Sequence, residues 1–318
     1  MRLPTVALSI LATCLSVQGF AKNPLSRPKI FGITSVTFCS NSLPAARDFY
    51  AKTVDPLLTC LTCAAEAPGQ FVARLPIGQS VLITKSTNDT RTSLLVNVTF
   101  ITENVQQLAK FLKFNNIEFK WNQARDSLSV ADPEGDVISF VGPPRIDRIT
   151  EQDAIQLGKV AAEARKHPHI PKLHLIHAGF VVHDRAAMDK FYKDLLGFRL
   201  YWHGGMKDGT DDWVDMQVPD GTDWIEYMLN VPANADKREL GVMNHIALGV
   251  PDIHEAEKQL IKNGWKPGEK PEIGRDGKWQ LNLYDPDGTR VELMEFTPVQ
   301  KPCCSDYTGP HPGQKRPQ

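Results

Sequence analysis

The feature that most constrains the fold of this chain is an internal repeat. Four segments each begin with an alternating apolar strand and continue into an amphipathic helix, and they start at Gly32, Leu94, Leu175 and Met243. In each segment a polar residue at the strand–helix junction is able to cap the helix, and apolar residues recur at spacings of three and four. Each repeat then closes with a turn and a short apolar strand. This recurrence predicts one βαβββ unit that is used four times.

The turns before the closing strands share one chemistry. Each contains proline and glycine, because proline presets φ and glycine supplies a positive φ, and three of the four also contain acidic residues. They are Pro76-Ile77-Gly78, Asp132-Pro133-Glu134-Gly135, Pro219-Asp220-Gly221 and Asp285-Pro286-Asp287-Gly288.

A charged and proline-rich stretch after the second repeat divides the chain into two domains. We expect a first domain over 30–142, a connector over 143–171, a second domain over 172–298 and a loose tail over 299–318. The predicted fold class is α+β. Two tandem domains each contain a pair of βαβββ units that form a curved mixed sheet around a cleft.

The amino terminus has the pattern of a signal peptide over residues 1–21. Arg2 precedes an apolar run over 5–17, which is too short to span a bilayer. We therefore expect export to the periplasm or secretion, with no transmembrane segment. In such an oxidising compartment Cys60 and Cys63 are able to close a disulfide.

The charge pattern limits the partners. The formal net charge is −1, and no basic block is present, so neither nucleic acid nor an anionic membrane surface is expected. We expect a small-molecule substrate and leave a homodimer open.

Histidines are distributed unevenly, and four residues of the second domain recur in register. All nine histidines lie at or beyond position 167. His177 and His245 lie in the first strands of the third and fourth repeats, and Glu226 and Glu292 lie in the last strands. The spacings are 49 and 47 residues. If the two units pair about a pseudo-twofold axis, all four side chains converge in one cleft.

A single strand histidine is more often a core residue than a ligand, and a single strand glutamate usually faces solvent. The register of all four favours a metal site instead, because a carboxylate among apolar residues is costly unless it is paired or bound to metal. Imidazole and carboxylate suit one divalent ion per chain, with Zn favoured and Ni, Mn or Fe as alternatives. The first domain carries Ser35, Ile83, Asn97 and Ser139 at the corresponding positions, so it reads as a copy without a metal site.

The motifs IHAGFVV, WIEYML, NHIALGV and YDPDGTRVELMEF resemble those of the vicinal oxygen chelate superfamily, which includes glyoxalase I, extradiol dioxygenases and bleomycin resistance proteins. The resemblance is close over 172–298 and weaker over 30–142. It implies that His177, Glu226, His245 and Glu292 correspond to the metal ligands of glyoxalase I. Extradiol dioxygenases use two histidines and one glutamate, and a catalytic histidine that their last-strand signature contains is missing between Gly277 and Pro286.

The resemblance implies a metal-dependent lyase or isomerase that stabilises an enediolate by Lewis-acid catalysis, with Glu292 or Glu226 transferring the proton. Two other hypotheses stay open: a ring-cleaving dioxygenase of the extradiol type, and a binding or resistance module without turnover. Arg275 and Lys278, in a loop near the cleft, are candidates for contact with an anionic substrate.

Overall fold

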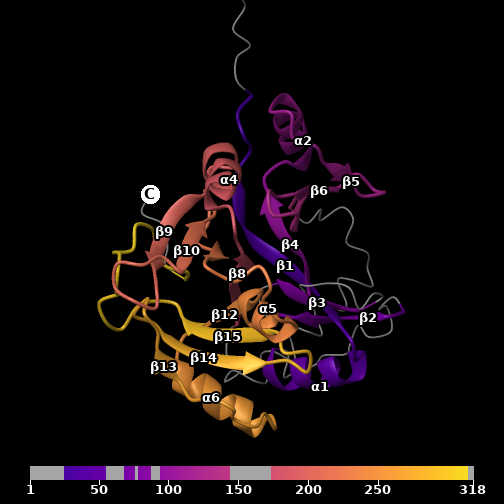
Figure 1. Ribbon diagram of the computed structural model, residues 1–318. Helices are drawn as coiled ribbons and strands as arrows, with labels where there is room; N and C mark the ends of the chain where they lie inside the picture. Colours follow the sequence, from indigo (N-terminus) through magenta and orange to yellow (C-terminus); the bar gives the residue numbers. More distant parts are fainter. Residues whose placement is uncertain (1–24, 55–67, 76–77, 87–93, 144–172, 314–318) are drawn as a thin grey trace, which may run out of the picture.

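The computed structural model describes residues 25–54, 68–75, 78–86, 94–143 and 173–313. These residues form two mixed β-sheets with helices on their outer sides (Figure 1). The first sheet is built within residues 30–141 and the second within residues 174–295. The predicted α+β fold of two tandem domains is confirmed.

Seven strands form the first sheet, in the spatial order β2-β3-β1-β4-β7-β6-β5. The first strands of the two repeats, β1 and β4, pair antiparallel in the middle, and each pairs parallel with the last strand of its own repeat, β3 or β7. The elements are β1 Ile30–Ser40, α1 Leu43–Thr53, β2 Gln70–Arg74, β3 Ser80–Lys85, β4 Leu95–Thr102, α2 Val105–Phe114, β5 Lys120–Trp121, β6 Ser127–Ala131 and β7 Val137–Val141.

Eight strands form the second sheet, in the order β13-β14-β15-β12-β8-β11-β10-β9. The pairing rule is the same: β8 and β12 are antiparallel in the middle, β8 is parallel to β11, and β12 is parallel to β15. The elements are β8 His174–Val181, α4 Arg185–Asp189 with its π-helical continuation η3 Lys190–Leu195, β9 Arg199–Gly204, β10 Trp213–Gln217, β11 Trp224–Met228, α5 Lys237–Met243, β12 Ile246–Val250, α6 Ile253–Lys262, β13 Glu272–Ile273, β14 Trp279–Tyr284 and β15 Arg290–Glu295.

The helix that follows the first strand of each repeat starts at a side-chain cap. Ser42, Asn104, Asp184 and Asp252 each accept a hydrogen bond from the backbone N–H three residues later, at 3.4, 2.9, 3.0 and 2.9 Å. These bonds satisfy backbone donors that a helix leaves free in its first turn. The polar residues at the strand–helix junctions therefore cap the helices, as the sequence pattern predicts.

Turns of each domain form hydrogen bonds with helices of the other domain. The hydroxyl of Tyr192, in η3, donates to Asp132 in the second repeat's turn at 3.0 Å, and the hydroxyl of Tyr50, in α1, donates to Asp285 in the fourth repeat's turn at 3.4 Å. Glu134 also accepts from the backbone at the start of α4 at 2.7 Å. The second repeat thus contacts the third and the first contacts the fourth. In agreement, α2 lies near α4, and α1 lies near α6 (Figure 1).

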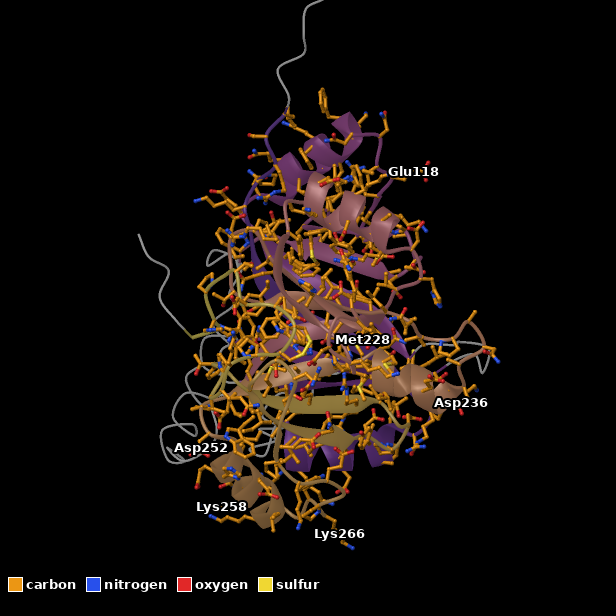
Figure 2. All side chains as sticks on the ribbon, turned by 60° about the vertical axis from the view of Figure 1, so that its left-hand side comes forward. Glu118, Met228, Asp236, Asp252, Lys258 and Lys266 are labelled. Carbon is orange, nitrogen blue, oxygen red and sulfur yellow. A yellow bond between two sulfur atoms is a disulfide. The ribbon has the colours of Figure 1, made fainter. Side chains whose placement is uncertain are left out.

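A buried amide joins the central strands of the two sheets. The Gln79 side chain donates to the carbonyls of Ile33, in β1, and Leu175, in β8, at 2.7 and 2.9 Å, and accepts from the Leu175 N–H at 2.7 Å. One apolar core runs through both sheets, and within it the rings of Phe100 and Phe198 meet edge to face. Met228 lies in the interior, whereas Lys258 and Lys266 lie at the periphery (Figure 2).

The carboxyl-terminal segment is not the loose tail that we expected. Val299 N–H donates to the carbonyl of Gly277 at 2.8 Å, and Thr308 N–H donates to the carbonyl of Tyr201 at 3.0 Å. The segment therefore crosses from the loop before β14 to β9, near opposite edges of the second sheet. Backbone groups near those edges hold the segment in place by hydrogen bonds. We expected a loose tail because the segment is rich in glycine and proline, and composition does not reveal such bonds.

Several predictions fall on residues outside the described ranges. The signal peptide, the connector and the proposed Cys60–Cys63 bridge all lie there, and they stay predictions. Within the described residues a disulfide joins Cys303 to Cys304, and Cys39 is a free, buried cysteine. None of the described helices has the length and apolar character of a membrane span.

Candidate metal centre

The four side chains singled out from the sequence come together on one face of the second sheet. His177 lies on β8, Glu226 on β11 and Glu292 on β15, and His245 immediately precedes β12. Glu226 is opposite Gly179 in the β8–β11 ladder, and Gly179 N–H bonds the carbonyl of His245 across the antiparallel pair at 2.9 Å. The pseudo-twofold pairing of β8 and β12 therefore produces the convergence.

Gly179 makes room for this arrangement. A Cβ atom at Gly179 would lie 2.2 Å from ring atoms of His245, which is far inside van der Waals contact. The imidazole of His245 thus passes over the bare backbone of β8 and reaches its partner His177.

The donor atoms are separated by distances that suit one shared metal ion. The Nε2 atoms of His177 and His245 lie 3.1 Å apart. Glu226 Oε2 lies 3.1 Å from His245 Nε2 and 3.7 Å from His177 Nε2. Glu292 Oε2 is 3.7 and 3.8 Å from the same two nitrogens. Ligands that bind one ion at about 2.1 Å stand about 3–3.5 Å apart, so Glu292 lies at the edge of the set.

The protonation states of the histidines also fit a metal. The ring N–H at Nδ1 of His245 donates to the carbonyl of Met243 at 2.9 Å, so Nε2 is the unprotonated nitrogen, and it faces the cluster. His177 Nδ1 is buried without a hydrogen-bond partner among the described residues. Burial holds the pKa of both imidazoles well below their usual range. Both rings are therefore neutral, which is the ligand form.

The carboxylates at the centre lack enough positive charge around them. Burial raises the pKa of Glu292 to about 8, although the nearby Arg290 opposes the shift. Asp215, on β10 directly opposite Glu226, is 4% exposed, and burial followed by repulsion from Glu226 raises the pKa of its carboxyl well above its usual range. A divalent cation would offset this accumulation of acidic groups.

Asp215 is a part of the site that sequence reasoning missed. One oxygen of its carboxylate is buried and has no hydrogen-bond partner among the described residues. The available signal was an aspartate inside the apolar strand WVDMQ. That signal pointed to no ligand pattern, because the register of β10 against β11 comes only from the fold.

Lys278 stands behind the site rather than in it. Its side chain is fully buried, and the ammonium group lies 4.5, 5.3 and 5.0 Å from the ring centres of Trp224, Tyr201 and Tyr307. Burial lowers the pKa of this ammonium, and the neighbouring Asp276 opposes the shift. Lys278 does not line the cavity, and aromatic rings from β9, from β11 and from the carboxyl-terminal segment surround its ammonium group instead.

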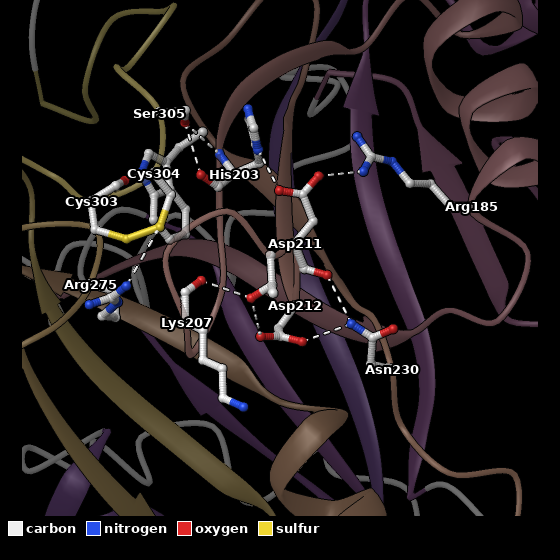
Figure 3. Close-up of polar contacts among 12 residues, drawn as sticks. Arg185, His203, Lys207, Asp211, Asp212, Asn230, Arg275, Cys303, Cys304 and Ser305 are labelled. Atoms are coloured by element: carbon white, nitrogen blue, oxygen red, sulfur yellow. Dashed lines mark hydrogen bonds and ion pairs between the residues drawn. A yellow bond between two sulfur atoms is a disulfide. The ribbon is translucent and has the colours of Figure 1, made fainter.

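A cavity of about 330 Å³ opens beside the four ligands. Its rim contains Arg275, whose guanidinium binds Asp208 and the carbonyl of Gly205 and lies 3.8 Å from the sulfur of Cys304 (Figure 3). The expected position of Arg275 at the cleft thus agrees with the structure. The cavity is lined by His177, Trp202, Met206, Trp213, Asp215, Trp224, Glu226, Glu272, Ile273, Gly274, Arg275, Asp276, Gln280, Asn282, Arg290, Glu292 and Met294.

Other histidines of the second domain have separate roles. His174 pairs with Asp223 at 2.9 Å, and His203 pairs with Asp211 at 2.6 Å. The latter contact belongs to the polar network around the loop after β9 (Figure 3). Neither imidazole reaches the candidate metal centre.

The first domain has small polar or apolar groups where the second has ligands. Register places Ser35, Asn97 and Ser139 at the positions of His177, His245 and Glu292, as the sequence alignment expected. The counterpart of Glu226 is Leu82 rather than Ile83, because Leu82 pairs with Thr37, the counterpart of Gly179. The Ser139 hydroxyl donates to Asn97 Oδ1 at 2.9 Å, so these two side chains satisfy each other without a cation.

The fold and this site define a class of protein. Residues 174–293 match the family described as Glyoxalase/Bleomycin resistance protein/Dioxygenase superfamily. The match lies over the second domain, and it confirms the resemblance of that domain's motifs to the vicinal oxygen chelate superfamily.

Two curated relatives match part of the chain. A lactoylglutathione lyase of Haemophilus influenzae is 27% identical over 125 residues, which cover 39% of this chain and 93% of that protein. A probable chloroplastic lactoylglutathione lyase of Arabidopsis thaliana is 24% identical over 137 residues, or 42% of this chain. The matched region spans 39% of the Arabidopsis protein.

Solved structures share the two-domain fold over a larger part of the chain. A variant of homoprotocatechuate 2,3-dioxygenase from Brevibacterium fuscum superimposes with a TM-score of 0.60 at 18% identity, covering 93% of this chain and 76% of that one. The anaerobic substrate complex of the same enzyme gives a TM-score of 0.58 at 16% identity. Identity this low shows a common fold and not a common reaction.

Proposed function

We propose that this protein is a metal-dependent lyase or isomerase of the glyoxalase type, acting on a small substrate with vicinal oxygens. The observation that carries the proposal is the position of Glu226. Its Oε2 atom lies 3.1 Å from His245 Nε2, so the centre offers two imidazoles and two carboxylates. The two relatives named as lactoylglutathione lyases support it.

His177, Glu226, His245 and Glu292 would hold one divalent ion. When bound, the ion supplies Lewis-acid polarisation of the substrate's two vicinal oxygens. Zn is our first choice, and Ni, Mn and Fe are alternatives, because the imidazole and carboxylate donors suit all of them.

The chain's own residues would handle the proton and exclude water. Glu292 Oε2 is buried at the cavity wall beside the donor nitrogens, where it is placed to take a proton from one carbon of the substrate and return it to the neighbouring carbon. Trp202, Trp224 and Met294 line the same cavity, and their apolar surfaces keep competing water away from that carbon.

A test combines elemental analysis with exchange of substrate protons. We expect about one divalent ion per chain and, with a small dicarbonyl or hydroxyacyl substrate, exchange of the α-proton with deuterated solvent. The variant E292Q keeps the shape of the side chain but loses the proton carrier, so we expect exchange to fall at least a hundredfold. Full exchange in metal-loaded E292Q would contradict the proposed mechanism.

The structural neighbours favour a second candidate, a ring-cleaving dioxygenase of the extradiol type. Their two-domain fold covers most of this chain. This candidate requires Fe and oxygen uptake with catechols, whereas the proposed isomerase works anaerobically. A binding module without turnover is the third candidate, and thermal stabilisation by a chelating ligand without product formation would identify it.

A further inference from the structure

Arg290 lies inside the candidate site, and the proposed chemistry gives it no role. It begins β15 and precedes Glu292 by two residues, so both side chains stand on the same face of the strand. Both line the cavity. A positive charge is therefore fixed next to the four ligands on the cavity wall.

The guanidinium has few partners. Its Nη2 atom donates to His245 Nε2 at 2.6 Å, and its buried Nε atom has no hydrogen-bond partner within the described part of the chain. Among the residues that the structure describes, no ion pair joins Arg290 to a carboxylate. Arginine does not lose its proton in proteins, so the charge persists and favours an anion.

The other cations near the cavity are already engaged. Arg275 binds Asp208 and the carbonyl of Gly205 at the rim. Lys278 is enclosed by aromatic rings behind the wall. An anion that enters the cavity therefore meets Arg290 as the cation closest to the ligand set.

The single acceptor of Arg290 is also a nitrogen that the metal would need. If His245 Nε2 binds an ion, the guanidinium loses that bond while it stays on the wall. Beside it on β14, Asn282 stands opposite Glu292, and its buried Oδ1 atom has no hydrogen-bond partner in the ranges that the structure describes. The wall thus offers a planar donor fork next to a free acceptor.

We propose that Arg290 binds a carboxylate of the substrate, which assigns the substrate to the small 2-oxo or 2-hydroxy acids. One carboxylate oxygen and the neighbouring oxygen face the four-ligand centre, and the guanidinium holds the carboxylate through charge-assisted bonds. In a 2-hydroxy acid, the hydroxyl group donates a hydrogen bond to Asn282 Oδ1. This inference rests on the proposed function, because it uses the same metal centre.

The test compares two inert probes that differ in charge. Oxamate carries a carboxylate beside an amide, and oxamide carries two neutral amides on the same two-carbon skeleton. Binding of each probe to the metal-loaded protein is measured by calorimetry for the wild type, Arg290→Gln and the control Arg199→Gln, whose exposed side chain on β9 lies outside the cavity lining. We expect Arg290→Gln to weaken oxamate binding roughly tenfold to a hundredfold. We expect little change for oxamide, or for oxamate in Arg199→Gln.

Metal content, measured on every sample, separates this inference from the proposed function. Equal metal content with unchanged oxamate affinity in Arg290→Gln overturns the inference and leaves the proposed function intact. A wild type that binds no metal overturns the proposed function; the inference then survives only if oxamate still binds and still needs Arg290. If Arg290→Gln fails to hold metal, Arg290→Lys takes its place. It keeps the charge but loses the planar fork, and unchanged oxamate affinity in it overturns the inference.

Discussion

Single residues decide the chemistry at this centre because they are buried together. Glu226 and Glu292 differ in position: Glu226 lies 3.1 Å from His245, whereas the closest histidine nitrogen to Glu292 is 3.7 Å away. Under the proposed function, we therefore expect Glu226 to be the firmer ligand and Glu292 to be the one that exchanges protons. Glu226 and Glu292 are equivalent in the repeat pattern, but their distances to the histidine nitrogens differ.

The first prediction concerns Glu226. The variant E226Q removes a charged donor, so we expect its affinity for a divalent ion to fall at least about tenfold, as losses of even outer partners do. Competition with a coloured chelator measures this affinity. The matched control is E272Q, at an exposed cavity position, where we expect no change. Equal losses in both variants would show that only the overall negative charge matters.

The second prediction concerns Lys278, which is fully buried near Asp276. Replacement by methionine keeps the length of the side chain but leaves the acidic groups without their counter-charge. We expect the variant K278M to lower the free energy of unfolding by about 3 kcal/mol.

Urea unfolding measures the loss of stability in K278M, and the variant Lys266→Met, at an exposed position, serves as the control. A K278M protein as stable as the control would show that those acidic groups are already neutral.

At the scale of elements, the strands position the ligands and the turns hold the two domains together. The carboxyl of Asp132, which is 6% exposed, accepts from Tyr192 and from the backbone of its own turn. Asp285 and Tyr50 form the corresponding pair. A repeated turn motif therefore serves two purposes: it closes each unit, and it anchors a helix from the opposite domain.

The third prediction is that the contribution of Asp132 to the free energy of unfolding depends on pH. Burial raises the pKa of Asp132 to about 6, above its value of about 3.9 in an unfolded chain. The folded state thus holds the proton more tightly, so this group's stabilisation is complete below about pH 4 and is lost as the pH rises through about 6. Between pH 5 and 7 it contributes a fall of about 1 kcal/mol in the free energy of unfolding.

The variant D132N tests that dependence. Its amide oxygen is able to accept the two backbone bonds at 3.0 Å, and its amide group is able to donate to Tyr192, so these contacts are kept without a titrating proton. We expect the decline between pH 5 and 7 to be about 1 kcal/mol smaller than in the wild type. Identical pH profiles would mean that Asp132 ionises normally in the folded protein.

At the scale of the whole molecule, the carboxyl-terminal segment completes the second domain. Tyr307 packs on Tyr201 and donates to Asp276, and the Tyr201 hydroxyl and His311 Nδ1 lie 2.6 Å apart. The segment also carries the Cys303–Cys304 disulfide, next to the cavity rim (Figure 3). Residues that belong to neither repeat of the second domain therefore pack against its sheet and cover Lys278.

The fourth prediction follows from that closure. Removal of residues 299–318 takes away the backbone bonds to β9 and to the loop before β14 and opens the aromatic enclosure of Lys278. We expect the melting temperature to fall by about 5 °C or more, as measured by calorimetry. A truncated protein with an unchanged melting temperature would contradict the structural role of this segment.

The sequence by itself determined the repeat, the α+β class, the helix starts and the choice of His177, Glu226, His245 and Glu292 as candidates. These depend on local periodicity, on turn chemistry and on residues that recur in register, all of which are written along the chain. Only the tertiary structure decided that Asp215 joins the site, that Lys278 stands behind it, that Arg290 faces the cavity, and that the tail closes the sheet. Those outcomes depend on contacts between residues far apart in the sequence. The burial and the charges of such residues are set by the fold, and they produce no periodic pattern along the chain.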